Sequence, residues 1–124
     1  MNDPILGHIT TFGGHPVCAA ASLACLNTIQ RDDLIDVESK VKVIQDQLIH
    51  PRIREIRNLG LMMSVEFESY EVLKPIIDKA IELGVITDWF LFNDKSMRIA
   101  PPLIISEDEL RKACGIILQA IDEA

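Results

Sequence analysis

Apolar side chains recur at helical spacing in four separate parts of the chain. The first helix is predicted over residues 17–29, directly after Pro16, because proline is tolerated in the first turn of a helix. Further helices are predicted over residues 34–48, 70–83 and 106–121. The last of these begins with Ser106 and Glu109, which stand three residues apart and match a capping box. Gly84 is expected to end the third helix.

Strict alternation of apolar and polar residues predicts a half-buried strand over residues 63–67, in the segment MSVEF. The apolar run VITDWFLF at residues 85–92 predicts a second strand, and residues 97–100 a third. Residues 93–96 are polar and are expected to form the turn of a hairpin between them. Hairpin-linked strands with segregated helices predict an α+β fold. We expect a small, mainly antiparallel sheet of three to four strands packed with about four helices.

Two apolar stretches differ from the ordinary amphipathic pattern. The helix at 17–29 is rich in alanine and therefore slim, so we expect other protein to cover much of it, including protein outside this chain. The run WFLF at residues 89–92 is more typical of a core or an interface than of a substrate wall. If a further domain normally covers these stretches, the chain alone exposes apolar surface and is expected to self-associate.

Composition excludes several functional classes. The chain has 124 residues, of which 48% are apolar, and this suits a compact globular domain. A formal charge of −7 opposes binding to a nucleic-acid backbone. No apolar run is long enough to span a bilayer. The N-terminus lacks the profile of a secretory signal, and the expected location is cytoplasmic.

The three cysteines are predicted to be reduced. Cys18 and Cys25 are seven residues apart on one predicted helix, about 10 Å along its axis, which is too far for a disulfide bridge. Cys114 has no nearby cysteine or histidine at metal-binding spacing. Small core residues are therefore the favoured interpretation of all three, and no metal site is predicted.

The stretch before Pro16 is a candidate anion site. The backbone N–H groups at a helix start are unpaired and favour negative charge, and Gly13 and Gly14 would let the backbone approach an anion. Thr10 or Thr11 would donate a hydroxyl. The stretch has no phosphate-loop Gly-Lys-Ser/Thr, however, and a threonine before a helix is more often a cap or turn residue. From the residues alone, the second interpretation is favoured.

Arg98 is the other candidate. It lies on a predicted strand between apolar neighbours, and two prolines end that strand. A guanidinium held on a strand can bind a carboxylate through two parallel hydrogen bonds, as an amino-acid or keto-acid site requires. The alternative is an exposed edge-strand arginine without a ligand, which the residues alone favour.

Three blocks carry a resemblance to a known family: TTFGGHPVCAAASLACL, IRNLGLMMSVEF and SMRIAPPLIISEDEL, in this order. Together they resemble the C-terminal part of class III aminotransferases, the ornithine and acetylornithine aminotransferase family of fold type I pyridoxal-phosphate enzymes. The resemblance implies that Thr11 binds the cofactor phosphate across a dimer interface, with Gly13 and Gly14 shaping the loop. It also implies that Arg98 pairs with a substrate carboxylate. Residues 1–15 would be an arm against the large domain, and residues 16–124 the small C-terminal domain.

The resemblance implies an amino transfer from an amino donor to a 2-oxo acid, performed by a homo-oligomer with a large domain. In the family, the Schiff-base lysine lies in that preceding large domain, and no lysine here matches its block. The expectation is therefore a piece of a longer enzyme, as a truncated product, an excised domain or a split-gene remnant, without activity or a catalytic residue of its own. The alternative is a non-catalytic α+β module for interaction or oligomerisation.

Overall fold

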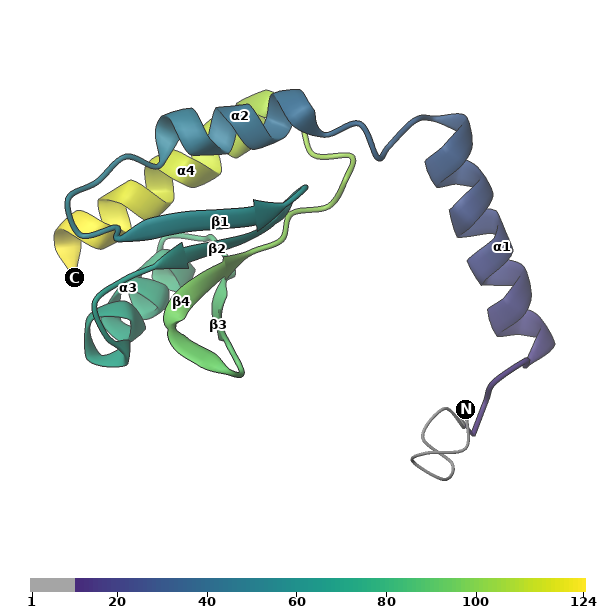
Figure 1. The fold of residues 1–124 in the computed structure, drawn as a ribbon, viewed down its shortest axis with the longest axis horizontal. Helices are drawn as coiled ribbons and strands as arrows, with labels where there is room; N and C mark the ends of the chain where they lie inside the picture. Colours follow the sequence, from purple (N-terminus) through teal and green to yellow (C-terminus); the bar gives the residue numbers. More distant parts are fainter. Residues whose placement is uncertain (1–10) are drawn as a thin grey trace. The chain divides into compact units, whose positions relative to one another are not determined.

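The computed structural model describes residues 11–124, and the chain divides into two compact units, Met1–Leu34 and Ile35–Ala124 (Figure 1). In the first unit the described part is a turn at residues 11–14 followed by helix α1 (Pro16–Arg31). The second unit holds every strand and the other three helices.

Helix α1 begins as predicted at Pro16, in its first turn, and extends to Arg31. It contains no buried residue, and apolar side chains such as Val17 and Leu23 are 70% and 59% exposed. The interpretation of all three cysteines as core residues is therefore wrong for Cys18 and Cys25, which are exposed, and holds only for buried Cys114. The helix has apolar side chains around its circumference, and its own unit is too small to enclose it.

The second unit is an α+β fold with a four-stranded antiparallel sheet, in agreement with the fold class expected from the sequence. Its elements are α2 (Glu38–Gln47), β1 (Glu55–Leu59), β2 (Met62–Glu66), α3 (Tyr70–Glu82), β3 (Asp88–Phe90), β4 (Asn93–Ile99) and α4 (Glu107–Glu123). The strand order is β1-β2-β4-β3. Helix α3 connects β2 to the edge strand β3, and β4 then lies between β2 and β3.

Strand β1 was missed, because the segment IREIRNL lacks the regular alternation of apolar and polar residues that marked β2. It pairs with β2 through a tight hairpin in which Leu59 lies opposite Met62. Gly60 occupies the first turn position at a φ of 55°, a conformation that glycine adopts without steric cost. A turn at Gly60 and Leu61 thus joins β1 to β2.

The hairpin formed by β3 and β4 is confirmed, but its turn lies at Leu91 and Phe92 and not at residues 93–96. Residues 93–96 instead begin β4. Ser96 pairs across the sheet with Glu66, and the Phe67 N–H donates to the Lys95 carbonyl at 2.9 Å. Pairing with β2 therefore overrides the turn preference of this polar segment.

The core lies between the sheet and helices α2, α3 and α4, which cover one face of it (Figure 1). From the sheet, Met63, Val65 and Met97 point into this core and are fully buried. The helices contribute Ile44, Leu73, Ile76, Ile77, Leu110, Ile117 and Ile121. Because side chains alternate along a strand, the intervening residues occupy the other face of the sheet, which no helix of this unit covers.

Two helix ends confirm the sequence signals that marked them. Gly84, at a φ of 99°, follows α3; its N–H bonds to the Ile81 carbonyl and the Val85 N–H to the Ala80 carbonyl, which is the pairing of a Schellman motif. At the start of α4, Ser106 and Glu109 form the predicted capping box. Helix α2 is shorter than predicted, since Leu34 and Val37 precede its first residue.

Candidate functional site

Arg98 lies on the open face of the sheet, in the middle of a row of side chains from neighbouring strands. It is exposed, whereas the preceding Met97 is fully buried on the core side. Arg98 stands opposite Ser64 of β2 and opposite Asp88 of β3. The row therefore places a hydroxyl on one side of the guanidinium and a carboxylate on the other, each one strand away.

The guanidinium of Arg98 makes no ion pair within residues 11–124. The adjacent Asp88 carboxylate accepts instead from the Trp89 N–H, at 2.8 Å. The backbone of Arg98 is fixed, since its carbonyl accepts from the Thr87 hydroxyl at 2.7 Å. The strand thus presents on its open surface a guanidinium that has no ion-pair partner among residues 11–124, which is an arrangement able to bind a carboxylate.

Glu66 is the other acidic residue on this face of the central strands, and it is neutralised locally. Its carboxylate lies 2.6 Å from the Lys95 ammonium and 2.7 Å from the Arg57 guanidinium. These two cations, Lys95 first, lower the pKa of Glu66 below its ordinary value. Lys95 and Arg57 hold the Glu66 carboxylate at the end of β2. Glu66 therefore forms no ion pair with Arg98.

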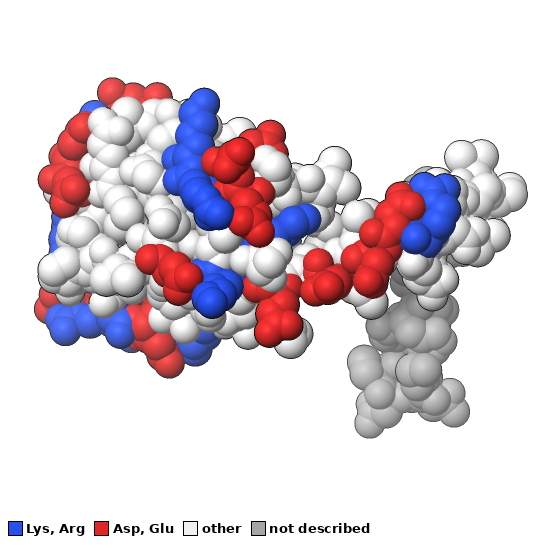
Figure 2. Space-filling model, turned by 90° about the horizontal axis from the view of Figure 1, so that it is seen from above, with Lys and Arg blue, Asp and Glu red and all other residues white. Residues whose placement is uncertain are grey.

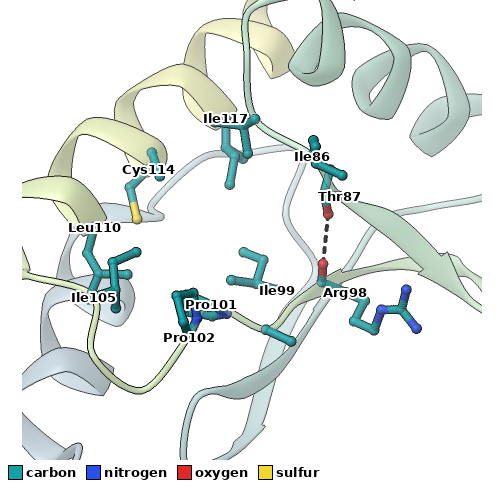
Figure 3. Close-up of a pocket in the computed structure, with 13 residues that line it drawn as sticks. Ile86, Thr87, Arg98, Ile99, Pro101, Pro102, Ile105, Leu110, Cys114 and Ile117 are labelled. Carbon is teal, nitrogen blue, oxygen red and sulfur yellow. Dashed lines mark hydrogen bonds between the residues drawn. The ribbon is translucent and has the colours of Figure 1, made fainter.

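Three hollows meet at Arg98. One, of about 260 Å³, lies between the sheet, α4 and the Pro101–Pro102 segment and is lined almost entirely by apolar side chains (Figure 3). Figure 3 shows that the Arg98 side chain points away from this hollow, so that only its backbone borders it. The other two, of about 490 and 410 Å³, share Met62 and Arg98 as lining residues. They include the open-face residues Ser64 and Asp88, respectively.

The second candidate, formed by Thr11, Gly13 and Gly14, belongs to the first unit. These residues are exposed in the turn before α1, where the His15 N–H bonds to the Phe12 carbonyl at 3.1 Å. Gly14 has a φ of 78°, which a side chain at this position would strain. Thr10 lies outside the described residues.

The helix start offers fewer free donors than an ideal anion site. Pro16 has no N–H, and the N–H of Val17 is already bonded to Nδ1 of His15, at 3.3 Å. His15 thus acts as the cap of α1. The exposed Thr11 hydroxyl and the glycine backbone fit one part of a phosphate site, and a complete site needs donors from elsewhere.

Four of the six lysines of the second unit are engaged by a carboxylate or a carbonyl group. Lys74 pairs with Asp78 at 2.5 Å, and Lys79 lies 3.1 Å from Glu123. Both pairings raise the pKa of the lysine, whereas an amine that forms a Schiff base needs a lowered pKa. Lys95 is held by Glu66, and Lys40 donates to the Leu103 carbonyl at 2.6 Å. Lys42 and Lys112 are exposed on helices.

Metal and membrane functions find no support in the described part of the chain. Among residues 11–124, no group of three or more His, Cys, Asp or Glu is arranged to hold a metal ion. No described helix combines the length and the apolar character that a bilayer crossing requires. On the face seen in Figure 2, basic and acidic side chains are interspersed, and no extended basic area is visible.

Comparison with known proteins assigns the family. The Aminotransferase class-III family model matches residues 2–121. An acetylornithine aminotransferase of Caldanaerobacter subterraneus is 34% identical over 122 residues, covering 94% of this chain and 30% of that protein. Ornithine aminotransferase 2 of Staphylococcus aureus is 36% identical over 107 residues, covering 83% of this chain and 26% of its own length.

Solved structures agree with the sequence relatives. The omega transaminase of Pseudomonas jessenii, solved in complex with PMP, superimposes with a TM-score of 0.83 at 27% identity, covering 95% of this chain and 29% of that one. The ornithine delta-aminotransferase of Plasmodium falciparum gives a TM-score of 0.76 at 28% identity, covering 94% of this chain and 31% of that one. The fold is that of an aminotransferase segment. The chain belongs to the class III aminotransferase family and spans about 30% of the length of the relatives it matches.

Sequence reasoning singled out Arg98 but missed the residues around it. Ser64 was assigned only to the polar side of β2, and Asp88 was part of an apolar run. Their positions beside Arg98 depend on the strand register, which a single sequence does not reveal. The alternation in MSVEF did carry a usable signal, because it placed Ser64 on the face opposite the core.

Proposed function

We propose that this chain supplies the small C-terminal domain of a pyridoxal-phosphate aminotransferase. The parent enzyme moves an amino group from an amino donor to a 2-oxo acid. Arg98 orients a substrate carboxylate, and Thr11, with Gly13 and Gly14, contributes to binding the cofactor phosphate in the partner subunit's site. The observation that carries the proposal is Arg98 on an open sheet face, without an ion-pair partner among residues 11–124, in a chain whose family match extends over residues 2–121.

The geometry around Arg98 supports a carboxylate ligand. An exposed arginine usually finds an acidic neighbour, yet Asp88 bonds to the Trp89 N–H and Glu66 is paired with Lys95 and Arg57. The strand fixes the arginine backbone, so that only the side chain remains to be ordered when a planar carboxylate binds.

The residues of this chain fit the cofactor only in part. Thr11 and the glycine turn would hold the phosphate end, whereas the lysines of the second unit are paired or exposed and do not fit the aldehyde end. When bound, pyridoxal phosphate supplies the electron sink for amino transfer. This partial fit supports our proposal that the chain alone does not transaminate and that the missing groups come from a large domain.

The partner in this proposal is a large domain together with a second copy of the complete enzyme, located in the cytoplasm. Exposed apolar side chains support a missing partner: Leu91 and Phe92 are 83% and 97% exposed. Small-molecule amino acids and 2-oxo acids would be the substrates. Nucleic acid is not expected as a partner, given the formal charge of −7.

A hybrid enzyme tests the proposal directly. This chain replaces the matching segment of the Caldanaerobacter acetylornithine aminotransferase, and transamination is assayed with an amino donor and 2-oxoglutarate. We expect an active hybrid. Arg98→Gln should raise KM for the carboxylate substrate about 10- to 100-fold, since a charged hydrogen-bonded pair is lost. Arg111→Gln, an equal charge change on α4, is the control and should leave KM unchanged.

The same hybrid tests the phosphate role. Thr11→Val should weaken pyridoxal-phosphate binding about tenfold through loss of one hydrogen bond to a charged oxygen. Thr28→Val, on α1, serves as the matched control. A folded hybrid in which Thr11→Val binds the cofactor as tightly as the parent would remove Thr11 from the site.

The isolated chain is tested by a pyridoxal-phosphate titration followed by absorbance, then by borohydride trapping and peptide mass mapping. We expect no saturable adduct at any single lysine and no turnover. Saturable trapping at one lysine would show that this chain provides the Schiff-base amine itself and would overturn the expected inactivity.

A non-catalytic interaction module is the second candidate function. The exposed Leu91, Phe92 and α1 favour it, because apolar surface of this kind is typical of an interface. Sedimentation of the isolated chain, together with the activity of the hybrid enzyme, distinguishes an interaction module from an enzyme domain. Self-association at low concentration together with an inactive hybrid supports the module, whereas a monomeric chain that completes an active hybrid supports the enzyme domain.

A further inference from the structure

The edge strand β3 is held to β4 over only a short distance. Strand β3 has three residues, and its register with β4 shifts between Trp89 and Phe90. Regular pairing on this side of β4 therefore ends with Asp88 opposite Arg98. So short a ladder at the edge of a sheet contributes few hydrogen bonds, and its ends open more readily than the centre of the sheet.

Arg98 lies close to the end of β4, which is Ile99. On the β2 side, pairing extends only one residue beyond Arg98, to Ile99 opposite Met63. Pro101 and Pro102 follow soon after and have no N–H with which to continue a sheet. The position of the Arg98 guanidinium therefore depends on the order of a strand end.

Thr87 provides an additional anchor at this end. It is half-buried directly before β3, and its hydroxyl donates to the Arg98 carbonyl at 2.7 Å (Figure 3). Residues 85–87 belong to no helix or strand, so this side-chain bond extends the contact of β3 with β4 beyond the last backbone pair. The branched Cβ of threonine restricts rotation about χ1, which helps to keep the hydroxyl in one direction.

We propose that Thr87 is a positioning residue for Arg98. Its hydroxyl keeps the end of β4 in place and thereby sets the affinity of the guanidinium for the substrate carboxylate. The inference rests on the proposed function, since Thr87 acts through Arg98 and not by contact with the substrate. Two parallel hydrogen bonds between an arginine and a carboxylate require a defined orientation, and a frayed backbone has to be ordered at a cost in affinity when the ligand binds.

The hybrid enzyme described above tests this role. Thr87→Val keeps the shape of the side chain but removes the donor, and it should raise KM for 2-oxoglutarate about three- to tenfold while kcat stays nearly unchanged. Thr87→Ser restores the hydroxyl and should bring KM back to within about twofold of the parent. Thr28→Val makes the same chemical change on α1 and should leave both constants unchanged.

A double substitution separates positioning from a general effect on folding. In the Arg98→Gln background, Thr87→Val should cause no further rise in KM, because no guanidinium is left to position. A purely structural role predicts instead that Thr87→Val lowers the amount of folded enzyme, and with it the apparent kcat, by the same factor in both backgrounds. Independent effects of the two substitutions would therefore overturn the positioning role.

Amide hydrogen exchange of the full chain, followed by NMR, tests the anchor without any activity. Thr87→Val should speed exchange in β3 and at the adjoining end of β4 about three- to tenfold, since one hydrogen bond that opposes local opening is lost. Exchange in the hairpin of β1 and β2 should not change, and Thr87→Ser should behave like the parent. Equal exchange of β3 in the parent and Thr87→Val would overturn the inference.

The outcomes distinguish this inference from the proposed function. A rise in KM with Arg98→Gln but not with Thr87→Val overturns the role of Thr87 and leaves the proposed role of Arg98 intact. An unchanged KM with Arg98→Gln overturns the carboxylate role of Arg98, and the positioning role of Thr87 with it. An inactive parent hybrid counts against both, whatever the exchange rates show.

Discussion

The two units of this chain use apolar side chains in opposite ways. Helix α4, in the second unit, buries Leu110, Cys114, Ile117, Ala120 and Ile121 along one stripe. Helix α1, in the first unit, is of similar length and buries none of its residues. Its sequence has no charged residue between Pro16 and Gln30, and its apolar side chains surround the helix axis.

This difference separates a helix that its own unit stabilises from one that depends on other protein. An amphipathic stripe such as that of α4 needs only one neighbouring layer, and the sheet with α2 and α3 provides it. A helix that is apolar all round needs cover on several sides. In the function proposed above, the large domain of the parent enzyme would provide that cover.

The largest expected effect is on global stability and falls on the core of the second unit. Phe67 is fully buried, so Phe67→Ala should lower the free energy of unfolding by about 3–5 kcal/mol. Leu26→Ala on α1, where the side chain is 52% exposed, should change it by less than about 0.5 kcal/mol. Urea unfolding followed by the fluorescence of Trp89 measures both, because Trp89 packs edge-on against Tyr70 in the second unit.

If Phe67→Ala does not fold, Ile76→Val provides the same comparison at about 0.5–1.5 kcal/mol, since Ile76 is also fully buried. A loss for Leu26→Ala as large as that for Phe67→Ala would break the contrast. It would mean that α1 is enclosed in solution, for example by a second copy of the chain.

A smaller effect is expected from the buried thiol of Cys114. Burial raises the pKa of Cys114 to about 11, from 9.0 for an ordinary thiol. Between these two values the folded state holds a proton that the unfolded state has lost, so the stability contribution is present below pH 9 and is lost as the pH rises to about 11. The free energy of unfolding should fall by about 2 kcal/mol more over this range in the parent than in Cys114→Ala.

Cys25→Ala is the matched control, because Cys25 is exposed on α1. The free energy of unfolding of Cys25→Ala should have the same pH dependence as that of the parent. Subtracting the free energy of either variant from that of the parent removes the effect of the lysine and tyrosine titrations, which all three proteins share. Equal pH profiles for Cys114→Ala and the parent would show that the thiol is solvated in the folded state, and the distinction between a buried α4 and an uncovered α1 would weaken.

The sequence predicted elements best where the pattern is local. The capping box of Ser106 and Glu109, the Gly84 helix end and the alternating strand MSVEF each reside within a few residues, and each is confirmed. Strand β1 and the start of β4 were not predicted, because their pairing depends on distant partners: β1 is an edge strand with mixed polarity, and residues 93–96 extend along β2.

Residues of the candidate site were likewise predicted only where the sequence signal is local. Arg98 could be singled out from its neighbours in the chain, whereas Ser64 and Asp88 reach it only through strand register. The roles of Thr11, Gly13 and Gly14 stay predictions, since the structure shows only that these residues are exposed in the turn before α1.

The smallest effect compares how the two helices begin. In α4 the Ser106 hydroxyl accepts from the Glu109 N–H at 3.3 Å, and the Glu109 carboxylate accepts from the Ser106 N–H at 2.9 Å. Ser106→Ala should lower the free energy of unfolding by about 1 kcal/mol. His15→Ala removes the cap of α1 and should change it by less than about 0.3 kcal/mol, because a helix that buries nothing contributes little to the cooperative core.

Low pH provides a second test of the difference between the caps of α4 and α1. The backbone N–H of Ser106, followed by its hydroxyl, lowers the pKa of Glu109 below 4.5, so the contribution of the carboxylate is present above that value and is lost as the pH falls through the lower pKa of the folded state. Ser106→Ala keeps the backbone N–H and loses only the hydroxyl, so the urea midpoints of the parent and Ser106→Ala should come closer in acid without becoming equal. If His15→Ala instead destabilises the chain as much as Ser106→Ala at neutral pH, α1 unfolds together with the sheet domain, and the two units are energetically one.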